Sequence, residues 1–181
     1  MRFEHEFRPI NSSEVESAYA VYLRVFEWLN AKGVRQWLRA LPFEVFLERE
    51  RKKELFGCFI EKRIAGVVSM ALEASPYWPE LGEESRWWIK TLAVDRKWRG
   101  AGVGVVTMRG CENRVWDAGA AEVFLDCVDV GFLPRYYAGS GYAVLGRKDI
   151  TDPSGNTFHV ALMKKKLPNQ TLQPTALSGR G

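Results

Sequence analysis

The sequence predicts a single α/β or α+β domain built on a mixed β-sheet, and three observations indicate that class. The chain has 181 residues, enough for one domain with a sizeable core. Hydrophobic residues make up 46% and charged residues 27%, proportions typical of a globular protein. Strand-like and helix-like patterns follow one another in the order β-α-α-β-β-β-α-β-α-β-β.

The first third of the chain predicts one strand and two helices. Residues 2–9 alternate loosely, as in a strand, and NSSE at 11–14 is a helix-capping signal. Apolar residues then recur at steps of three and four, which is typical of an amphipathic helix: Val15, Ala18, Val21, Tyr22, Val25, Phe26 and Leu29. Asn30 and Gly33 end that helix, and a shorter helical pattern covers 43–53.

Three strands are predicted next. Segments 55–62 and 64–74 are separated by little more than Arg63, which indicates a β-hairpin. The following stretch, 74–85, contains two prolines and a glycine and is predicted to be a loop. The apolar run RWWIKTLAV at 86–94 predicts the third of these strands.

The rest of the chain predicts further helices and strands, followed by a tail. The elements are a helix over 103–118, a strand over 122–128, a short helix over 134–139, and strands over 142–150 and 157–167. Pro134 is tolerated in the first turn of a helix, and TDPSGN at 151–156 is a turn sequence. Residues 168–181 are polar and lack periodicity, which predicts a disordered tail behind a domain of residues 1–167.

Composition also excludes several classes of protein. No apolar run approaches the roughly 20 residues that span a bilayer, and the N-terminus is charged where a signal peptide is apolar, so we expect a soluble, cytoplasmic protein without a membrane partner. Three cysteines without CxxC spacing and two distant histidines predict no metal site. The net charge of +4 falls short of a nucleic-acid-binding signature, so no nucleic-acid partner is expected.

The segment VDRKWRGAGVG at 94–104 joins a predicted strand to a predicted helix. A helix N-terminus presents unpaired N–H groups and partial positive charge, and glycines let the backbone itself touch a phosphate. A plain turn is the alternative, but Gly104 falls inside the helix, where glycine costs about 1 kcal/mol relative to alanine. The spacing lacks the third glycine of a dinucleotide fingerprint and the lysine of a P-loop. We therefore predict a phosphate-binding site of another kind.

Two motifs in order resemble a known family. The pattern [Arg/Gln]-x-x-Gly-x-[Gly/Ala] is filled by Arg99, Gly102 and Gly104. One helix and one strand later, Tyr137 precedes a Gly-Tyr pair at 141–142 by four residues. Together they resemble the acyl-CoA-binding motif and the tyrosine helix of the GNAT superfamily of N-acetyltransferases, over residues 56–165 well and over the first 55 residues more loosely.

The resemblance implies a twisted, mostly antiparallel central sheet with splayed central strands, flanked by helices. It implies acetyl-CoA as acyl-donor cosubstrate, with no metal. The backbone of Leu92, Ala93 and Val94 would pair with the pantetheine amides, and an N–H near Leu92 would polarise the thioester carbonyl. The cofactor pyrophosphate would lie against the glycine motif, which comprises Arg99, Gly100, Ala101, Gly102, Val103, Gly104 and Val105.

Tyr137 is by this resemblance the catalytic acid that protonates the departing CoA thiolate, and simple packing is the alternative. A phenol pKa of about 10 exceeds the thiol value of about 8.5. The expected reaction is acetyl transfer to a primary amine, of a small molecule or a peptide, by direct attack in a ternary complex. A covalent route through Cys127 is less attractive because that residue lies in a predicted buried strand. A homodimer stays open.

The general base and the acceptor are not identified by the sequence. Many relatives carry a glutamate on the strand before the glycine motif, but 86–94 contains no acid. Glu83, Glu84 and Asp126 lie nearby, and each is more typical of a surface or structural carboxylate. The asparagine that many members carry before the tyrosine helix is replaced by VDVGFLP at 128–134. Five aromatic residues are candidates for the acceptor pocket or for plain core packing: Trp37, Tyr77, Trp78, Trp87 and Trp88.

Two other functions remain as alternatives. A domain of the same fold could bind acyl-CoA as a sensor without turnover, which the missing strand carboxylate keeps open. A nucleic-acid-binding protein would use the basic segments 96–99 and 163–166, and would show salt-dependent binding.

Overall fold

The computed structural model describes residues 3–37, 39–151 and 155–168, and over these it confirms the predicted order of strands and helices. The strands are β1 (His5–Pro9), β2 (Leu55–Ile60), β3 (Arg63–Glu73), β4 (Arg86–Val94), β5 (Glu122–Val128), β6 (Ala143–Thr151) and β7 (Thr157–Lys166). The helices are α1 (Val15–Ala31), α2 (Phe43–Arg51), α3 (Val103–Asp117) and α4 (Leu133–Gly139), with three short 3-10 helices, η1 (Ser12–Glu14), η2 (Pro79–Leu81) and η3 (Arg96–Trp98).

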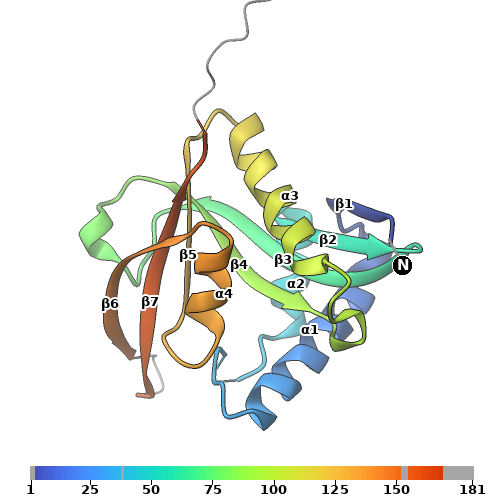
Figure 1. Cartoon of the computed structure of the whole chain (residues 1–181), viewed down its shortest axis with the longest axis horizontal. Helices are drawn as coiled ribbons and strands as arrows, with labels where there is room; N and C mark the ends of the chain where they lie inside the picture. The colour runs from blue at the N-terminus through green and yellow to red at the C-terminus, as the bar shows by residue number, and fades with distance from the viewer. Residues whose placement is uncertain (1–2, 38, 152–154, 169–181) are drawn as a thin grey trace, which may run out of the picture.

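One seven-stranded sheet runs through the molecule in the order β1-β2-β3-β4-β5-β7-β6. Neighbouring strands are antiparallel except β4 and β5, which are parallel and therefore need the crossover helix α3. Among the described residues, β4 and β5 share a single ladder pair, Trp88 with Phe124. The two strands diverge beyond it (Figure 1), so the predicted mixed sheet with splayed central strands is confirmed.

Helices cover both faces of the sheet. A Cβ on Gly66 of β3 would meet Val103 and Thr107 of α3, whereas Ser69 of the same strand accepts a hydrogen bond from Arg49 of α2. Positions 66 and 69 point to opposite faces because side chains alternate along a strand. Helices α3 and α4 therefore lie over one face, and α1 and α2 over the other (Figure 1).

The predicted capping signal at 11–14 is confirmed, with Asn11 and Glu14 forming a capping box at η1. Several predicted boundaries were wrong by more than one residue. Within the described residues the first strand begins at His5, the helix predicted over 43–53 ends at Arg51, and the strand predicted over 55–62 ends at Ile60. The hairpin turn is formed by Glu61 and Lys62, both with positive φ, and Arg63 already belongs to β3. Lys53 has a φ of +60°, and its N–H donates to the Glu50 carbonyl at 2.9 Å, which turns the chain directly into β2.

The predicted loop 74–85 has a buried anchor that its proline and glycine content did not indicate. Trp78 is only 2% exposed and packs with Trp88 and Phe124 beneath the sheet. The predicted turn at 151–156 lies partly outside the described residues, and the predicted tail does so from residue 169 onward. None of the helices in the described part of the chain is long and apolar enough to cross a membrane.

Candidate active site

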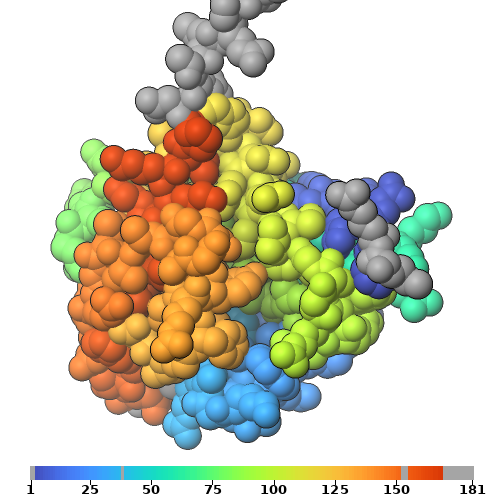
Figure 2. Space-filling view, in the orientation of Figure 1, coloured from blue at the N-terminus to red at the C-terminus, as the bar shows by residue number. Residues whose placement is uncertain are grey.

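The gap between β4 and β5 opens into two cavities. The first, which we call the glycine-side cavity, has a volume of about 520 Å³ and is lined by Gly100, Gly102 and Gly104 with Val94 and Tyr136. The second, the aromatic cavity, has a volume of about 400 Å³ and includes Trp37, Tyr77, Trp88 and Phe158 in its walls. Four residues line both: Leu29, Leu92, Leu133 and Tyr137. In Figure 2 the surface is hollowed between the yellow-green glycine loop and the orange α4, where the first cavity lies.

The glycine loop has a backbone conformation that few residues other than glycine adopt. Gly100 and Gly102 have φ values of +79° and +80°, in the left-handed region that favours glycine. Gly102 caps α3, and no side chain of the described residues accepts from the first N–H groups of the helix. These groups and the helix dipole make an anion site. Of the predicted loop residues, Arg99, Val103 and Val105 also line the cavity, whereas Ala101 does not.

Gly104 is required by its surroundings within the protein. A Cβ at this position would overlap the hydroxyl of Tyr136, which reaches the first turn of α3 from α4. Glycine here therefore leaves room for the Tyr136 hydroxyl beside the first turn of α3.

Two side chains hold the loop from outside the glycine motif. His5 Nε2 lies 2.7 Å from the Ala101 carbonyl oxygen, which ties β1 to the loop. Asp95, only 4% exposed, accepts hydrogen bonds from Arg24 at 2.7 Å and from the Lys97 amide at 3.2 Å. Burial alone would raise the pKa of Asp95, but these hydrogen bonds hold it below its usual value.

The strand β4 carries a bulge where the two cavities meet. The β3–β4 register runs from Val67 opposite Ala93 to Ser69 opposite Lys90, so Thr91 and Leu92 together face a single β3 residue. Thr91 has a φ of +52°, a conformation that costs a β-branched residue about 1–2 kcal/mol. The bulge was not predicted from the sequence.

The three β4 residues predicted to contact the cofactor, which lie at the bulge or directly after it, differ in whether they line a cavity. Leu92 lines both cavities and Val94 lines the glycine-side cavity. Ala93 is buried at 1% exposure and lines neither.

Tyr137 lies at the junction of the cavities. It is 9% exposed, and its ring packs edge-on against Tyr136 at 5.2 Å and Tyr142 at 6.3 Å between ring centres. Its hydroxyl has no hydrogen-bond partner among the described residues and is free to meet a ligand. Burial raises the pKa of Tyr137 above its usual value, so the phenol is protonated at neutral pH.

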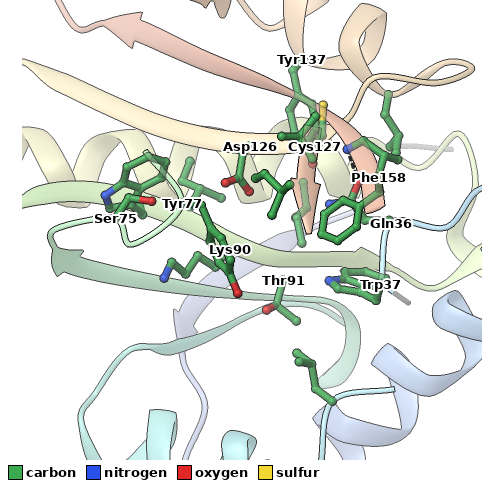
Figure 3. A pocket seen from close by; sticks show the side chains of 18 of the residues that line it. Gln36, Trp37, Ser75, Tyr77, Lys90, Thr91, Asp126, Cys127, Tyr137 and Phe158 are labelled. Carbon is green, nitrogen blue, oxygen red and sulfur yellow. Dashed lines mark hydrogen bonds between the residues drawn. The ribbon is translucent and has the colours of Figure 1, made fainter. Parts of the chain in front are cut away.

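Figure 3 shows the aromatic cavity. The Asp126 carboxylate and the Tyr77 ring lie in its middle, and Trp37 and Phe158 lie at one end. Asp126 Oδ2 accepts a hydrogen bond from the buried Trp78 indole N–H at 3.1 Å. Burial raises the pKa of Asp126 above its usual value, although the indole and the charge of Lys90 oppose the shift.

Some of the residues proposed from the sequence for the acceptor pocket line this cavity, and others do not. Trp37, Tyr77 and Trp88 line it, whereas Trp78 and Trp87 do not. Neither Glu83 nor Glu84 lines it, and Glu84 instead pairs with Arg86 at 3.2 Å. Glu73, at the end of β3, lines the cavity and forms an ion pair with Lys90. It was missed because nothing in the hairpin sequence indicates which side of the sheet the last residue of β3 faces.

The cysteines are buried, as predicted for Cys58 and Cys127. Burial raises the pKa of Cys127 to about 12, so its thiol is protonated and weakly nucleophilic near neutral pH. Within the described residues, no three metal-binding side chains come together.

Solved structures share this fold. An acetyltransferase from Listeria monocytogenes superposes with a TM-score of 0.74 at 18% identity, over 91% of this chain and 96% of the other. The Drosophila melanogaster polyamine N-acetyltransferase superposes with a TM-score of 0.68 at 19% identity, over 91% of this chain and 100% of the other. The likeness extends over almost the whole length of both.

The sequence comparisons give the class and then the family. An uncharacterized N-acetyltransferase of Bacillus subtilis, YesJ, is 26% identical over 146 residues, which is 76% of this chain and 81% of the relative. The name of this relative and the fold of the solved structures agree on the class of acetyltransferases. A model of the acetyltransferase (GNAT) family matches residues 22–133, more than half of the chain. The chain belongs to the GNAT family of acetyltransferases.

Proposed function

We propose that this enzyme transfers the acetyl group of acetyl-CoA to a primary amine by direct attack in a ternary complex. The observation that carries the proposal is the position of Tyr137, which lines both a glycine-side cavity suited to phosphates and an aromatic cavity that contains carboxylates. Donor and acceptor would enter from opposite faces of the sheet and meet at this residue.

The glycine-side cavity fits acetyl-CoA. The open N-terminus of α3 and the left-handed Gly100 and Gly102 offer backbone N–H groups to a pyrophosphate, and Arg96 and Arg99 add positive charge. Val94 and Leu92 continue the wall toward Tyr137, along the edge of β4 that β5 leaves unpaired.

The chemistry requires the nitrogen to attack the thioester carbonyl and the C–S bond to break. Overall, two protons leave the ammonium form of the acceptor: one ends on the CoA sulfur, and the other goes to solvent. Tyr137 holds a proton at neutral pH, donates it to the thiolate, and regains one that the acceptor nitrogen has released. Cys127 is not used, because its thiol is kept protonated by burial.

A screen of primary amines that follows free CoA thiol tests this proposal. Wild type should release CoA with at least one amine, and Tyr137→Phe should lower kcat by about 10²–10⁴-fold with little change in the Kd of acetyl-CoA. Tyr142→Phe removes a hydroxyl from the same ring cluster, lines neither cavity, and serves as the matched control. An unchanged kcat in Tyr137→Phe contradicts the role of Tyr137.

The sensor alternative stays open because β4 itself contains no acidic residue that could act as the general base. The same screen distinguishes a sensor from an enzyme. Tight binding of acetyl-CoA without thiol release for any amine favours a sensor. Three lysines of the two basic segments form ion pairs, which speaks against the nucleic-acid alternative: Lys97 with Asp95, Lys164 with Glu122, and Lys165 with Glu112. Salt-dependent binding to a DNA or RNA duplex would favour that alternative.

A further inference from the structure

The aromatic cavity contains four charged side chains, of which only two neutralise each other. Lys90 and Glu73 form an ion pair. Arg49 and Asp126 have no oppositely charged group within 4 Å among the described residues. Lys90 acts on Asp126, and Glu54 and Glu73 act on Arg49, only through longer-range attraction, so each side chain can take a direct partner of opposite charge from a ligand.

Arg49 reaches the cavity from α2. One of its terminal nitrogens donates to Ser69 Oγ at 2.6 Å, and Glu54 and Glu73 act on it only through longer-range attraction. Burial lowers the pKa of Arg49 from its usual value, but a guanidinium stays protonated. Most of its five N–H donors remain available, in the planar arrangement that matches a carboxylate.

Asp126 reaches the cavity from β5. Its Oδ2 is held by the Trp78 indole, which leaves Oδ1 for a donor from the ligand. The buried tryptophan fixes the carboxylate next to the opening that Leu92 and Tyr137 line.

The sheet register puts the two side chains on the same face of the sheet. Ser69, which anchors Arg49, lies opposite Lys90, and the pair of Trp88 with Phe124 puts Asp126 at the position that corresponds to that lysine. The anchor and the carboxylate are separated by β4 and by the gap that opens where β5 diverges from it. Because Arg49 and Asp126 both line the cavity within this gap, a ligand with opposite charges at its two ends can contact both.

We propose that the acceptor is a zwitterion of the amino-acid class, with its ammonium group at Asp126 and its carboxylate at Arg49. This inference rests on the proposed acetyl transfer. The walls formed by Trp37, Tyr77 and Phe158 receive an aliphatic or aromatic side chain, and about 400 Å³ is ample for such a molecule. The amine nitrogen then forms the amide bond, one of its protons passes through Asp126 to solvent, and the carboxylate is unchanged.

The test compares L-amino acids that have aliphatic or aromatic side chains with the amines that lack only the carboxylate, such as L-phenylalanine against phenethylamine. For the best pair, kcat/KM with acetyl-CoA should favour the amino acid by at least about tenfold. Arg49→Gln should abolish that preference by raising the KM of the amino acid, while the decarboxylated amine is little affected. General structural damage would lower both equally. Arg51→Gln, which removes an exposed arginine of the same helix that pairs with Glu48, is the matched control.

A binding measurement keeps the inference testable without turnover. Calorimetric titration of the CoA-loaded protein with L-phenylalanine should give saturable binding in wild type, weakened at least about tenfold in Arg49→Gln. Thiol release with equal or better rates for the decarboxylated amines would overturn the inference and leave the proposed function standing. Amino-acid binding without thiol release for any acceptor would support the assignment of the cavity and overturn the transferase function.

Discussion

The two cavities that meet at Tyr137 are built from different parts of the chain. The glycine-side cavity is centred on one continuous segment, 92–105, in which Gly100, Gly102 and Gly104 keep side chains away from the backbone, and residues of α1 and α4 complete its walls. The aromatic cavity is formed by side chains from α2, β3, β4, β5, β7 and the segment after α1. The first should tolerate loss of side chains and reject their addition, whereas the second depends on the side chains that it has.

The largest expected effect follows from adding one carbon atom to the glycine-side cavity. Gly104→Ala places a Cβ on the Tyr136 hydroxyl and should weaken acetyl-CoA binding by about 100-fold, measured by calorimetry, because the Tyr136 side chain, which lines the same cavity, must be displaced. Gly139→Ala is the matched control, since a Cβ there meets no atom within 4 Å. Equal effects of the two substitutions would contradict the role of close packing at Gly104.

Asp95 is an exception to this contrast, because its side chain holds the segment next to the glycine loop through hydrogen bonds from Arg24 and the Lys97 amide. Asp95→Asn should lower the free energy of unfolding by about 1–2 kcal/mol at pH 7, since it weakens hydrogen bonds from Arg24 and the Lys97 amide. The depressed pKa of Asp95 means that its contribution is present above the unfolded value near 4 and is lost as the pH falls through the folded value. Urea unfolding of both proteins at pH 7 and pH 3 should therefore show the difference shrinking at the lower pH.

Truncating a side chain that lines the aromatic cavity should change the KM of the acceptor and leave the binding of acetyl-CoA unchanged. Trp37→Ala removes a wall of that cavity and should raise the acceptor KM about tenfold, while the Kd of acetyl-CoA stays within twofold. Because Trp37 also packs against Tyr22 at 4.9 Å between ring centres, thermal unfolding should be measured alongside. A parallel loss of acetyl-CoA affinity would show that the cavities are not separable.

The smallest effect should come from deleting an exposed charge of the glycine motif. Arg99 is exposed, so Arg99→Ala should weaken acetyl-CoA binding only about two- to fivefold, and less as salt concentration rises. A loss as large as that of Gly104→Ala would mean that side chains, rather than backbone, carry the donor site.

The same contrast explains what could be predicted from the sequence. The glycine motif and Tyr137 belong to short patterns of neighbouring residues, so both could be recognised from the sequence without knowing the fold. Asp126 was visible as an acid on a strand, but the side of β5 that it faces depends on the register with β4 and β7. Arg49 and Glu73 carried no signal, because they reach the cavity only when α2 packs on the sheet and β3 ends at its rim. The left-handed Thr91 arises from a mismatch between two strands and has no signature in either.

The wall common to both cavities also relates the sizes of the two substrates. An acyl group and an acceptor that approach from opposite faces of the sheet meet in one opening, bounded by Leu29, Leu92, Leu133 and Tyr137. Each methylene added to the acyl chain extends through that opening and occupies space on the acceptor side. If the proposed transfer is correct, longer donors would require smaller acceptors, and the combined length of acyl group and acceptor, rather than the length of either, would limit the product.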